Sequence, residues 1–367
     1  MSLFELRGDL TRTQRIILGV AGLVVLLLVW WLLAEGLSRE KPVVEYTTRY
    51  DQLDKNIFDV DSLAREDSIR FADATEFVKV YPTLPPPLHV VEAYPTLIQR
   101  DGIFGNALQS IWLNLRGYFW AILISLSVGF LIGLIPLLRG MFSGQVNAMR
   151  YLPLTALTGL FIVWFGIDDQ MKIAFLAFGI LVYMLPVVVQ RIDEVRKVYL
   201  QTVYTLGASD WQTVKTVYLP SVLSKFIDDI RVLTAISWTY IIIAEYLNRT
   251  GGLGAMIYSK QRMSKVPEMF AILLLIILIG FLQDRLFVYL DRRLFPHKYL
   301  KSARAGVKEI RYGIFTVLGV FALTILLGVF VPTLVSSISL VLWVLVGAGV
   351  LLVLFGEFKL QAQTAKS

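Results

Sequence analysis

The stretch "TLGASDWQTVKTVYLP", residues 205–220, is a polar segment between two strongly apolar runs. Gly207 allows a turn, and Leu219-Pro220 is a pair that ends helices, so we expect two short helices that stop before the next run. The apolar side chains form one broken stripe at helical spacing: Val203, Leu206, Ala208, Trp211, Val214, Val217 and Tyr218. Such a stripe fits a groove on a soluble protein or the surface of a bilayer, and the residues alone favour neither.

The composition around this segment indicates a membrane protein. Of the 367 residues, 56% are hydrophobic and 17% are charged, whereas soluble domains carry about 25% charged residues. A helix needs about 20 apolar residues to cross the hydrocarbon, and eight runs are candidates. They are residues 16–36, 110–138, 150–166, 171–190, 226–247, 269–290, 312–332 and 335–355.

Two of these runs are open to another interpretation. The run at 150–166 is short and contains Pro153. The run at 16–36 could be taken for a signal peptide, but its apolar part is longer than a usual h-region, and Trp30-Trp31 are typical of interfacial anchors. We therefore predict a retained first span.

The net charge of +7 follows membrane topology and does not require a nucleic-acid partner. Residues 291–312 carry seven Lys or Arg against two acidic residues, so the positive-inside rule places this loop in the cytoplasm. Alternation then puts both termini and residues 191–224 inside, and the acidic region 37–106 outside. Residues 248–268 depart from the rule, because they fall outside yet carry four basic residues. This loop is a re-entrant or contact surface, or one span is wrongly predicted.

The segment at 198–220 resembles the cytoplasmic "EAA" loop of ABC-importer permeases. That pattern is Glu-Ala-Ala, three residues, Gly, nine residues and Ile-x-Leu-Pro. Here nine residues separate Gly207 from Val217-Tyr218-Leu219-Pro220, while Gln201-Thr202-Val203 replaces Glu-Ala-Ala. The replacement removes an acidic residue from the family's contact with its ATPase. We call residues 198–220 the coupling loop.

The resemblance extends over roughly residues 84–298 and is to the nitrate/sulfonate/taurine subgroup. "LPPPLHVVEAYPTLI" (84–98), "LTALTGLFIVWFGI" (154–167), "DIRVLTAISWTYIIIAEYL" (229–247) and "GGLGAMI" (251–257) follow the subgroup's order. The two spans after residue 312 lie outside the resemblance, and the insert at 45–80 is longer than the family usually has.

The resemblance implies an all-α polytopic fold: a type I ABC-importer permease core with an extra N-terminal outer insert and two added C-terminal spans, about eight transmembrane helices in all. We expect four parts: the N-terminus and first span (1–40), an outer insert with a Pro-rich entry (41–105), the permease core (106–300), and a basic loop with two added spans (301–367). Residues 191–224 are the core's cytoplasmic segment. The expected location is the bacterial cytoplasmic (inner) membrane.

The resemblance also implies the function and the partners. The chain would be the permease of an ATP-driven importer for a small anionic solute such as nitrate, a sulfonate, taurine or bicarbonate. An ATPase dimer, a solute-binding protein outside the membrane, a second permease copy and lipid would be its partners. Contact with the ATPase falls to Gln201, Leu206, Gly207, Ala208, Trp211, Leu219 and Pro220.

Three residues of the 226–247 span are candidates for the solute pathway. The resemblance places Arg231, Trp238 and Glu245 at family positions. Charges within spans are costly and tend to face a partner or a watery path, so Arg231 would suit an anionic cargo. The alternative is that Arg231 and the nearby Asp228 only anchor the inner end of the span.

Other chemistry has no motif in this sequence. There is no G-x-x-x-x-G-K-[ST] loop, so Mg-ATP would bind to the partner ATPase, and we expect no catalytic residue, cofactor or metal in this chain. Gly129-x-x-x-Gly133 indicates close helix packing, within or between subunits. The alternative function is a permease-like scaffold or sensor that binds partners without transport. A self-sufficient channel or secondary transporter would show an internal repeat, which is not evident.

Overall fold

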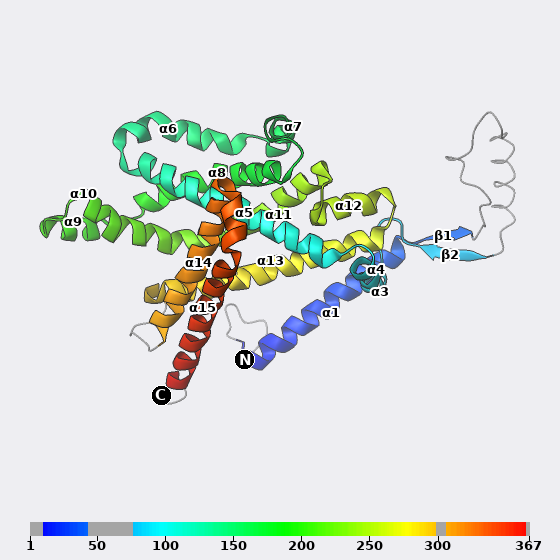
Figure 1. The fold of residues 1–367 in the computed structure, drawn as a ribbon. Coiled ribbons are helices and arrows are strands. Elements are labelled where there is room, and N and C mark those ends of the chain that lie inside the picture. Colours follow the sequence, from blue (N-terminus) through cyan, green and yellow to red (C-terminus); the bar gives the residue numbers. More distant parts are fainter. Residues whose placement is uncertain (1–9, 43–75, 299–305, 365–367) are drawn as a thin grey trace. The chain divides into compact units, whose positions relative to one another are not determined.

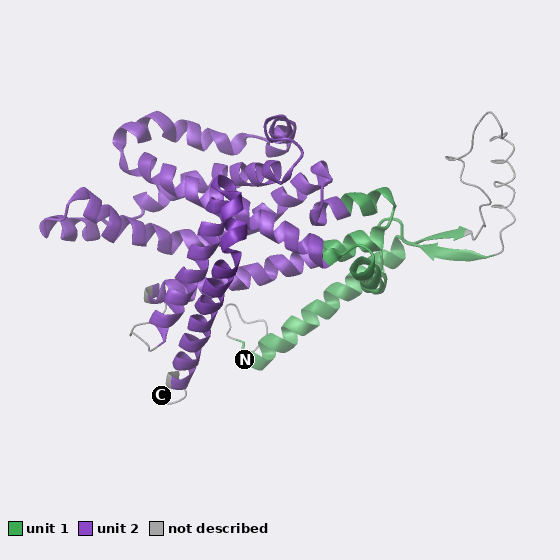
Figure 2. Ribbon diagram, viewed as in Figure 1, with its two compact units in different colours: residues 1–103, 257–274 green, residues 104–256, 275–367 purple. Residues whose placement is uncertain are grey.

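The computed structural model describes residues 10–42, 76–298 and 306–364, most of which are helical (Figure 1). Contacts divide the chain into two compact units, residues 1–103 with 257–274 and residues 104–256 with 275–367 (Figure 2). Most of the predicted outer insert and part of the predicted basic loop lie outside the described residues.

The first unit contains helix α1 (Arg12–Gly36), which corresponds to the first predicted span. A capping box between Thr11 and Gln14 starts the helix, and its 25 residues extend about 37 Å, enough to cross the hydrocarbon. The indole N–H of Trp30 donates to the carbonyl of Pro85 at 3.0 Å, and its ring lies 6.0 Å from that of Phe270. Trp30 therefore contacts protein, although the sequence predicts an anchor in the membrane interface.

The rest of the first unit is a short hairpin and two short helices. Strands β1 (Arg39–Pro42) and β2 (Phe77–Val80) pair antiparallel. Helices α3 (Pro87–Glu92) and α4 (Tyr94–Gln99) follow, and the hydroxyl of Tyr94 donates to the carbonyl of Ala271 at 3.0 Å.

The second unit contains the long helices of the predicted core. Three helices, α5, α12 and α13, begin or end in the first unit. The described helices in chain order are α5 (Ile103–Leu134), α6 (Pro136–Ala148), η2 (Met149–Tyr151), α7 (Leu154–Phe165), α8 (Asp169–Asp193), α9 (Lys197–Thr205), α10 (Asp210–Thr213), the π-helix η3 (Val214–Tyr218), α11 (Leu219–Asn248), α12 (Gly252–Arg262), α13 (Val266–Leu294), η4 (Pro296–Lys298), α14 (Val307–Phe330) and α15 (Pro332–Thr364).

Helices α5 and α8 pack in parallel through glycines of α5. A Cβ atom at Gly117 would meet Leu176, one at Gly129 would meet Val188, and one at Gly133 would meet Ile192. The residue numbers rise together in both helices, so both run in the same direction. The Gly129-x-x-x-Gly133 pair therefore packs within this chain, which settles one of the two possibilities left by the sequence.

Because α5 and α8 run in the same direction, the chain between them must cross the membrane once in the opposite direction. Seven described helices are long and apolar enough to span a membrane, and they match seven of the eight predicted runs. The run at 150–166 instead corresponds to α7, which has 12 residues and follows α6 and η2 with a bend of 103°. A 12-residue helix is about 18 Å long, less than the roughly 30 Å hydrocarbon core. We infer that the bent pair is the return crossing, which makes eight.

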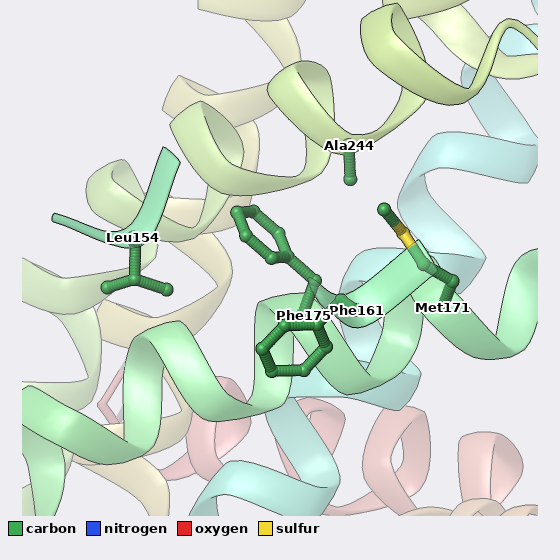
Figure 3. Close-up of a cluster of buried hydrophobic side chains, with 5 residues drawn as sticks. All are labelled: Leu154, Phe161, Met171, Phe175 and Ala244. Carbon is green, nitrogen blue, oxygen red and sulfur yellow. The ribbon is translucent and has the colours of Figure 1, made fainter. Parts of the chain in front are cut away.

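The core of the second unit lies where α7, α8 and α11 meet. Figure 3 shows Leu154 and Phe161 of α7, Met171 and Phe175 of α8, and Ala244 of α11, all buried in one cluster. The rings of Phe161 and Phe175 lie 5.6 Å apart in an edge-to-face arrangement, which aromatic pairs prefer.

The two added spans, α14 and α15, form an antiparallel hairpin. A Cβ atom at Gly313 would meet the backbone of Gly349, and one at Gly356 would meet Gly306 and Ile310. Small residues at these crossings let the two backbones approach closely, as in other membrane helix pairs. Phe321 of α14 in turn packs edge-to-face on Trp112 and Phe119 of α5.

We predict that the double substitution Gly129→Ala/Gly133→Ala lowers the free energy of unfolding by about 1–3 kcal/mol, the usual cost of overpacking. The added methyl groups would meet Val188 and Ile192. Gly140→Ala/Gly144→Ala is the matched control, because this pair has the same spacing on α6 but no atom within 4 Å. Thermal or denaturant unfolding in detergent measures the difference. Equal stability of the two double variants would contradict the packing role.

Candidate functional site

The coupling loop is a turn between two short helices. Helix α9 ends at Thr205, and Gly207 has a φ of +75°, a conformation that glycine adopts without steric cost. Ser209 and Gln212 then form a capping box that starts α10. The predicted helix–turn–helix is thus present, and the sequence correctly identifies Gly207 as the turn.

The predicted helix stop at Leu219-Pro220 is wrong. Residues Asp210–Asn248 form one continuous helical stretch of 39 residues. Pro220 cannot donate to a carbonyl one turn back, and the π-helix before it absorbs this defect, with the N–H of Leu219 donating to the carbonyl of Val214. A proline in the first turn of α11 is therefore tolerated.

The apolar stripe of the loop divides into a buried and an exposed part. Val217 is buried, and Val203, Ala208, Val214 and Tyr218 are half-buried. In contrast, Leu206 is 81% exposed and Trp211 is 74% exposed. Gln201 also lies at the surface, together with Gly207, Leu219 and Pro220. The loop thus presents two large apolar side chains outward from a fixed turn.

A cluster of charges holds the base of the loop. The guanidinium of Arg191 at the end of α8 donates to Asp229 of α11 at 2.7 and 2.8 Å and to Glu194 at 2.8 Å. Lys225 of α11 donates to the same Glu194 carboxylate at 2.8 Å. We call Arg191, Glu194, Lys225 and Asp229 the ionic clamp. It joins the helices that enter and leave the coupling loop, and a cavity of about 470 Å³ lies beside it.

Arg231 and Trp238, two of the pathway candidates, reach neighbouring residues of α13. The guanidinium of Arg231 donates to Asp284 at 3.0 and 3.1 Å, and the indole of Trp238 donates to Gln283 at 2.8 Å. Asp228 lies 3.8 Å from Arg231, so the predicted pairing within α11 is the weaker one, and Asp228 also bonds to Lys298. Both candidates therefore link α11 to α13.

Glu245, the third candidate, is fully buried in a different polar cluster. Its carboxylate accepts hydrogen bonds from the hydroxyl of Ser110 at 2.7 and 2.9 Å and from the backbone N–H of Gly254 at 2.9 Å. A Cβ atom at Gly252 would overlap the Glu245 carboxylate. The glycines of "GGLG" therefore let α12 begin directly against Glu245, and the three pathway candidates are not brought together.

Sequence reasoning missed the α5 residues that hold the start of α12 beside Glu245, and it missed one buried charge. Asn106 accepts from the N–H of Gly252, and Ser110 accepts from the N–H of Leu253, both from α5. Lys172, near the start of α8, has no exposed surface and bonds to Asp169 and to the carbonyl of Thr250. A lysine inside the run "DQMKIAFLAF" is the available sequence signal, since a charge there needs a partner.

The basic loop at 248–268 contains a short helix, and two of its four cations, Lys260 and Lys265, form ion pairs. Helix α12 has 11 residues, about 16 Å, too short to cross. Lys260 is nearly buried and bonds to Asp101 at 2.7 Å and Glu268 at 2.6 Å, and Lys265 bonds to Glu268 at 3.0 Å. Burial alone would lower the pKa of Lys260, but these carboxylates outweigh it and raise the pKa. The pairing of these two lysines reduces the net positive charge of a loop that the sequence predicts to lie outside.

The comparisons with known proteins identify the class. Residues 121–296 match the family described as "Binding-protein-dependent transport system inner membrane component". A solved structure titled "Inward facing conformations of the MetNI methionine ABC transporter: CY5 native crystal form" aligns with a TM-score of 0.47 and 19% identity, over 52% of this chain and 94% of that one. Residues 121–296 therefore form a domain of this family, and the relatives that this chain resembles are permease components of ABC transporters. The predicted family and the helical polytopic fold are confirmed.

Two relatives with similar sequences are named as taurine and sulfonate permeases. The chain is 28% identical over 218 residues to the taurine transport system permease protein TauC of Escherichia coli, which covers 58% of this chain and 79% of TauC. It is 28% identical over 214 residues to the putative aliphatic sulfonates transport permease protein SsuC of Bacillus subtilis, which covers 58% of this chain and 76% of SsuC. The hairpin α14–α15 lies beyond the matched residues, as the resemblance predicts.

The ionic clamp predicts a pH-dependent stability. Hydrogen bonds from Lys225 and Arg191 lower the pKa of Glu194 from its usual 4.5 to about 2. A carboxylate with a depressed pKa stabilises the fold above the unfolded pKa, and this contribution is lost as the pH falls through the folded pKa. We expect Glu194→Gln to lower Tm at pH 7, and the difference from wild type to shrink between about pH 4.5 and 2.

Thermal unfolding in detergent across this pH range measures the effect. Glu92→Gln is the control, because Glu92 is exposed and forms no ion pair with a described residue. A Tm difference for Glu194→Gln that stays constant from pH 7 to 3 would contradict the clamp.

Proposed function

We propose that this permease imports a small anionic solute across the bacterial inner membrane, driven by an ATPase dimer that docks on the coupling loop. The observation that carries the proposal is the exposure of Leu206 and Trp211 at a turn fixed by Gly207 and the Ser209 cap. Large apolar side chains exposed on a rigid element are typical of residues that anchor an interface.

The proposed mechanism couples ATP to the spans through this loop. Two permease copies form the pathway, and a solute-binding protein delivers cargo at the outer face. Mg-ATP closes the partner ATPases, which move the docked loops, and the spans change from inward-open to outward-open by rigid-body rotation. The ionic clamp supports this scheme, since it ties the loop to α8 and α11 on both sides.

The docking contact differs chemically from the family pattern. Gln201 stands where the family has glutamate, and its side chain lies at the surface. A neutral amide cannot replace the charge of that glutamate, so we propose that apolar contacts through Leu206 and Trp211 supply most of the docking energy. The same change favours the second candidate, a permease-like scaffold without transport, which would lack a bound ATPase.

The proposed cargo is a sulfonate-like anion. The named relatives transport taurine or, by description, aliphatic sulfonates. Arg231 on α11 remains our candidate for a cation that guides such an anion near the inner end of the pathway, with Trp238 and Glu245 on the same helix. The side chain of Arg231 is 30% exposed although it is paired with Asp284, so an anion can compete for it.

Substitutions in the coupling loop test docking. We predict that Gly207→Asp and Trp211→Ala each abolish co-purification of the ATP-binding subunit and solute uptake, with membrane insertion unchanged. Gly207→Asn separates charge from backbone, because asparagine tolerates a positive φ, and should retain binding better than Gly207→Asp. Trp343→Ala removes an equally exposed tryptophan from α15 and serves as control. Normal uptake by Gly207→Asp would refute docking, and no ATPase with the wild type would favour the scaffold.

The pair Arg231–Asp284 tests the pathway. We expect Arg231→Gln to reduce uptake of a labelled sulfonate at least tenfold, since a lost charge-assisted hydrogen bond costs about 1.5–3 kcal/mol. The swapped double variant Arg231→Asp/Asp284→Arg restores an ion pair but moves the cation to α13. Recovery of uptake by the swap would show that the pair is only structural, and unchanged uptake by Arg231→Gln at normal expression would exclude the role entirely.

A further inference from the structure

One cation of the core helices has no bonded partner among the described residues. Helices α5, α8 and α11 carry five: Arg116, Lys172, Arg191, Lys225 and Arg231. The last four each lie within 4 Å of a carboxylate. Arg116 is partly buried on α5, and the described residues offer its guanidinium neither a hydrogen bond nor an ion pair. The carboxylate of Asp169 interacts with Arg116 electrostatically without a hydrogen bond, and it is itself bonded to Lys172.

Arg116 lines a cavity of about 780 Å³ in the second unit. This volume falls within the range of about 300–1,000 Å³ that is typical of small-molecule sites. The other polar side chain on its wall is the amide of Gln170, and the tryptophans Trp120 and Trp164 stand beside them. Trp120 lies one helical turn after Arg116, so both face the same side of α5.

The aromatic side chains that line the cavity pack against the buried cluster of the second unit. Phe161 of α7 lines the cavity and also belongs to the buried cluster in Figure 3. Its ring lies 5.6 Å from Phe178, 5.7 Å from Trp164 and 5.8 Å from Phe165, and all three also line the cavity. The apolar surface therefore exists without a ligand, which lowers the ordering cost of binding.

The added hairpin supplies another wall. Gly328 and Val329 at the end of α14 and Pro332 at the start of α15 line the same cavity. The aromatic contacts of Phe321 with α5 hold α14 in place. The hairpin lies beyond residues 121–296, so this chain adds a surface to the cavity that the matched family region does not contain.

We propose that this cavity binds an oxyanion joined to a short apolar body, with Arg116 on the oxyanion and the aromatic wall on the body. A guanidinium presents parallel N–H groups that match the oxygens of a sulfonate, carboxylate or phosphate. The amide of Gln170 can donate to the same group, and Trp120 and Trp164 cover an apolar chain. Two sources have this chemistry, a soluble organic anion and the headgroup of an anionic lipid. The soluble source rests on the proposed import function.

The test is binding to the full chain, purified without an ATPase, in nanodiscs of zwitterionic lipid. The probe is butane-1-sulfonate, followed by tryptophan fluorescence, with butan-1-ol as the uncharged control. The chain has eight tryptophans, so a Trp164→Phe variant assigns the signal to the cavity. A parallel set of nanodiscs contains phosphatidylglycerol and receives no sulfonate.

We expect saturable binding that Arg116→Gln weakens at least tenfold, as expected for loss of charge-assisted hydrogen bonds. Arg116→Lys, which keeps the charge but not the fork, should bind with intermediate affinity and shows the effect even if Arg116→Gln folds poorly. Arg285→Gln is the matched control, because it removes the same charge from α13, where Arg285 lies over Phe281.

The outcomes separate the sources and the proposals. A response to sulfonate that depends on Arg116 assigns the site to a soluble anion. A response that depends on Arg116 with phosphatidylglycerol alone assigns it to lipid. No saturable response to either, or equal affinity of the wild type and a folded Arg116 variant, would overturn the proposal. Because the isolated chain is used, this result does not depend on whether an ATPase docks on the coupling loop.

Discussion

The parallel packing of α5 on α8 constrains the rest of the second unit. Gly117, Gly129 and Gly133 have no room for a side chain, so the two backbones approach closely and run in the same direction. The chain must then return between them, and we infer that the bent pair of α6 and α7 provides the return. That bend brings Phe161 and Trp164 to the same region as Arg116, which creates the aromatic cavity. The three glycines of α5 thus determine both the path of the chain and the position of a candidate ligand site.

Features governed by neighbouring residues could be predicted from the sequence. The apolar runs gave the seven long helices, and the spacing from Gly207 to Pro220 identified the coupling loop. The helix end at Pro220 was wrongly predicted, because the local rule for proline takes no account of a π-turn that absorbs the missing N–H. The run at 150–166 was similarly ambiguous, because a run too short to span by itself can be interpreted as part of a crossing only when α5 and α8 are known to be parallel.

The partners of buried charges could not be predicted, because they are distant in sequence. Ser110 meets Glu245 across 135 positions, and Asp284 meets Arg231 across 53. The cost of a charge in a span shows that a partner must exist but not which residue it is. Sequence reasoning weighed Arg231 for the cargo and did not consider Arg116. Only the geometry shows that the first is paired and that the second faces a cavity.

The continuous helix from Asp210 to Asn248 has a mechanical consequence. Its 39 residues extend about 58 Å at 1.5 Å per residue, so Trp211 and Asn248 are the two ends of a single rod. If the rod pivots near one end, a tilt of about 5° displaces the other by about 5 Å, as follows from this length. The π-turn at Val214–Tyr218 lies close to Trp211, so bending there would shorten the rigid part of the helix by only a small fraction of its length. The exposed loop and the buried Glu245 cluster are therefore two ends of one lever.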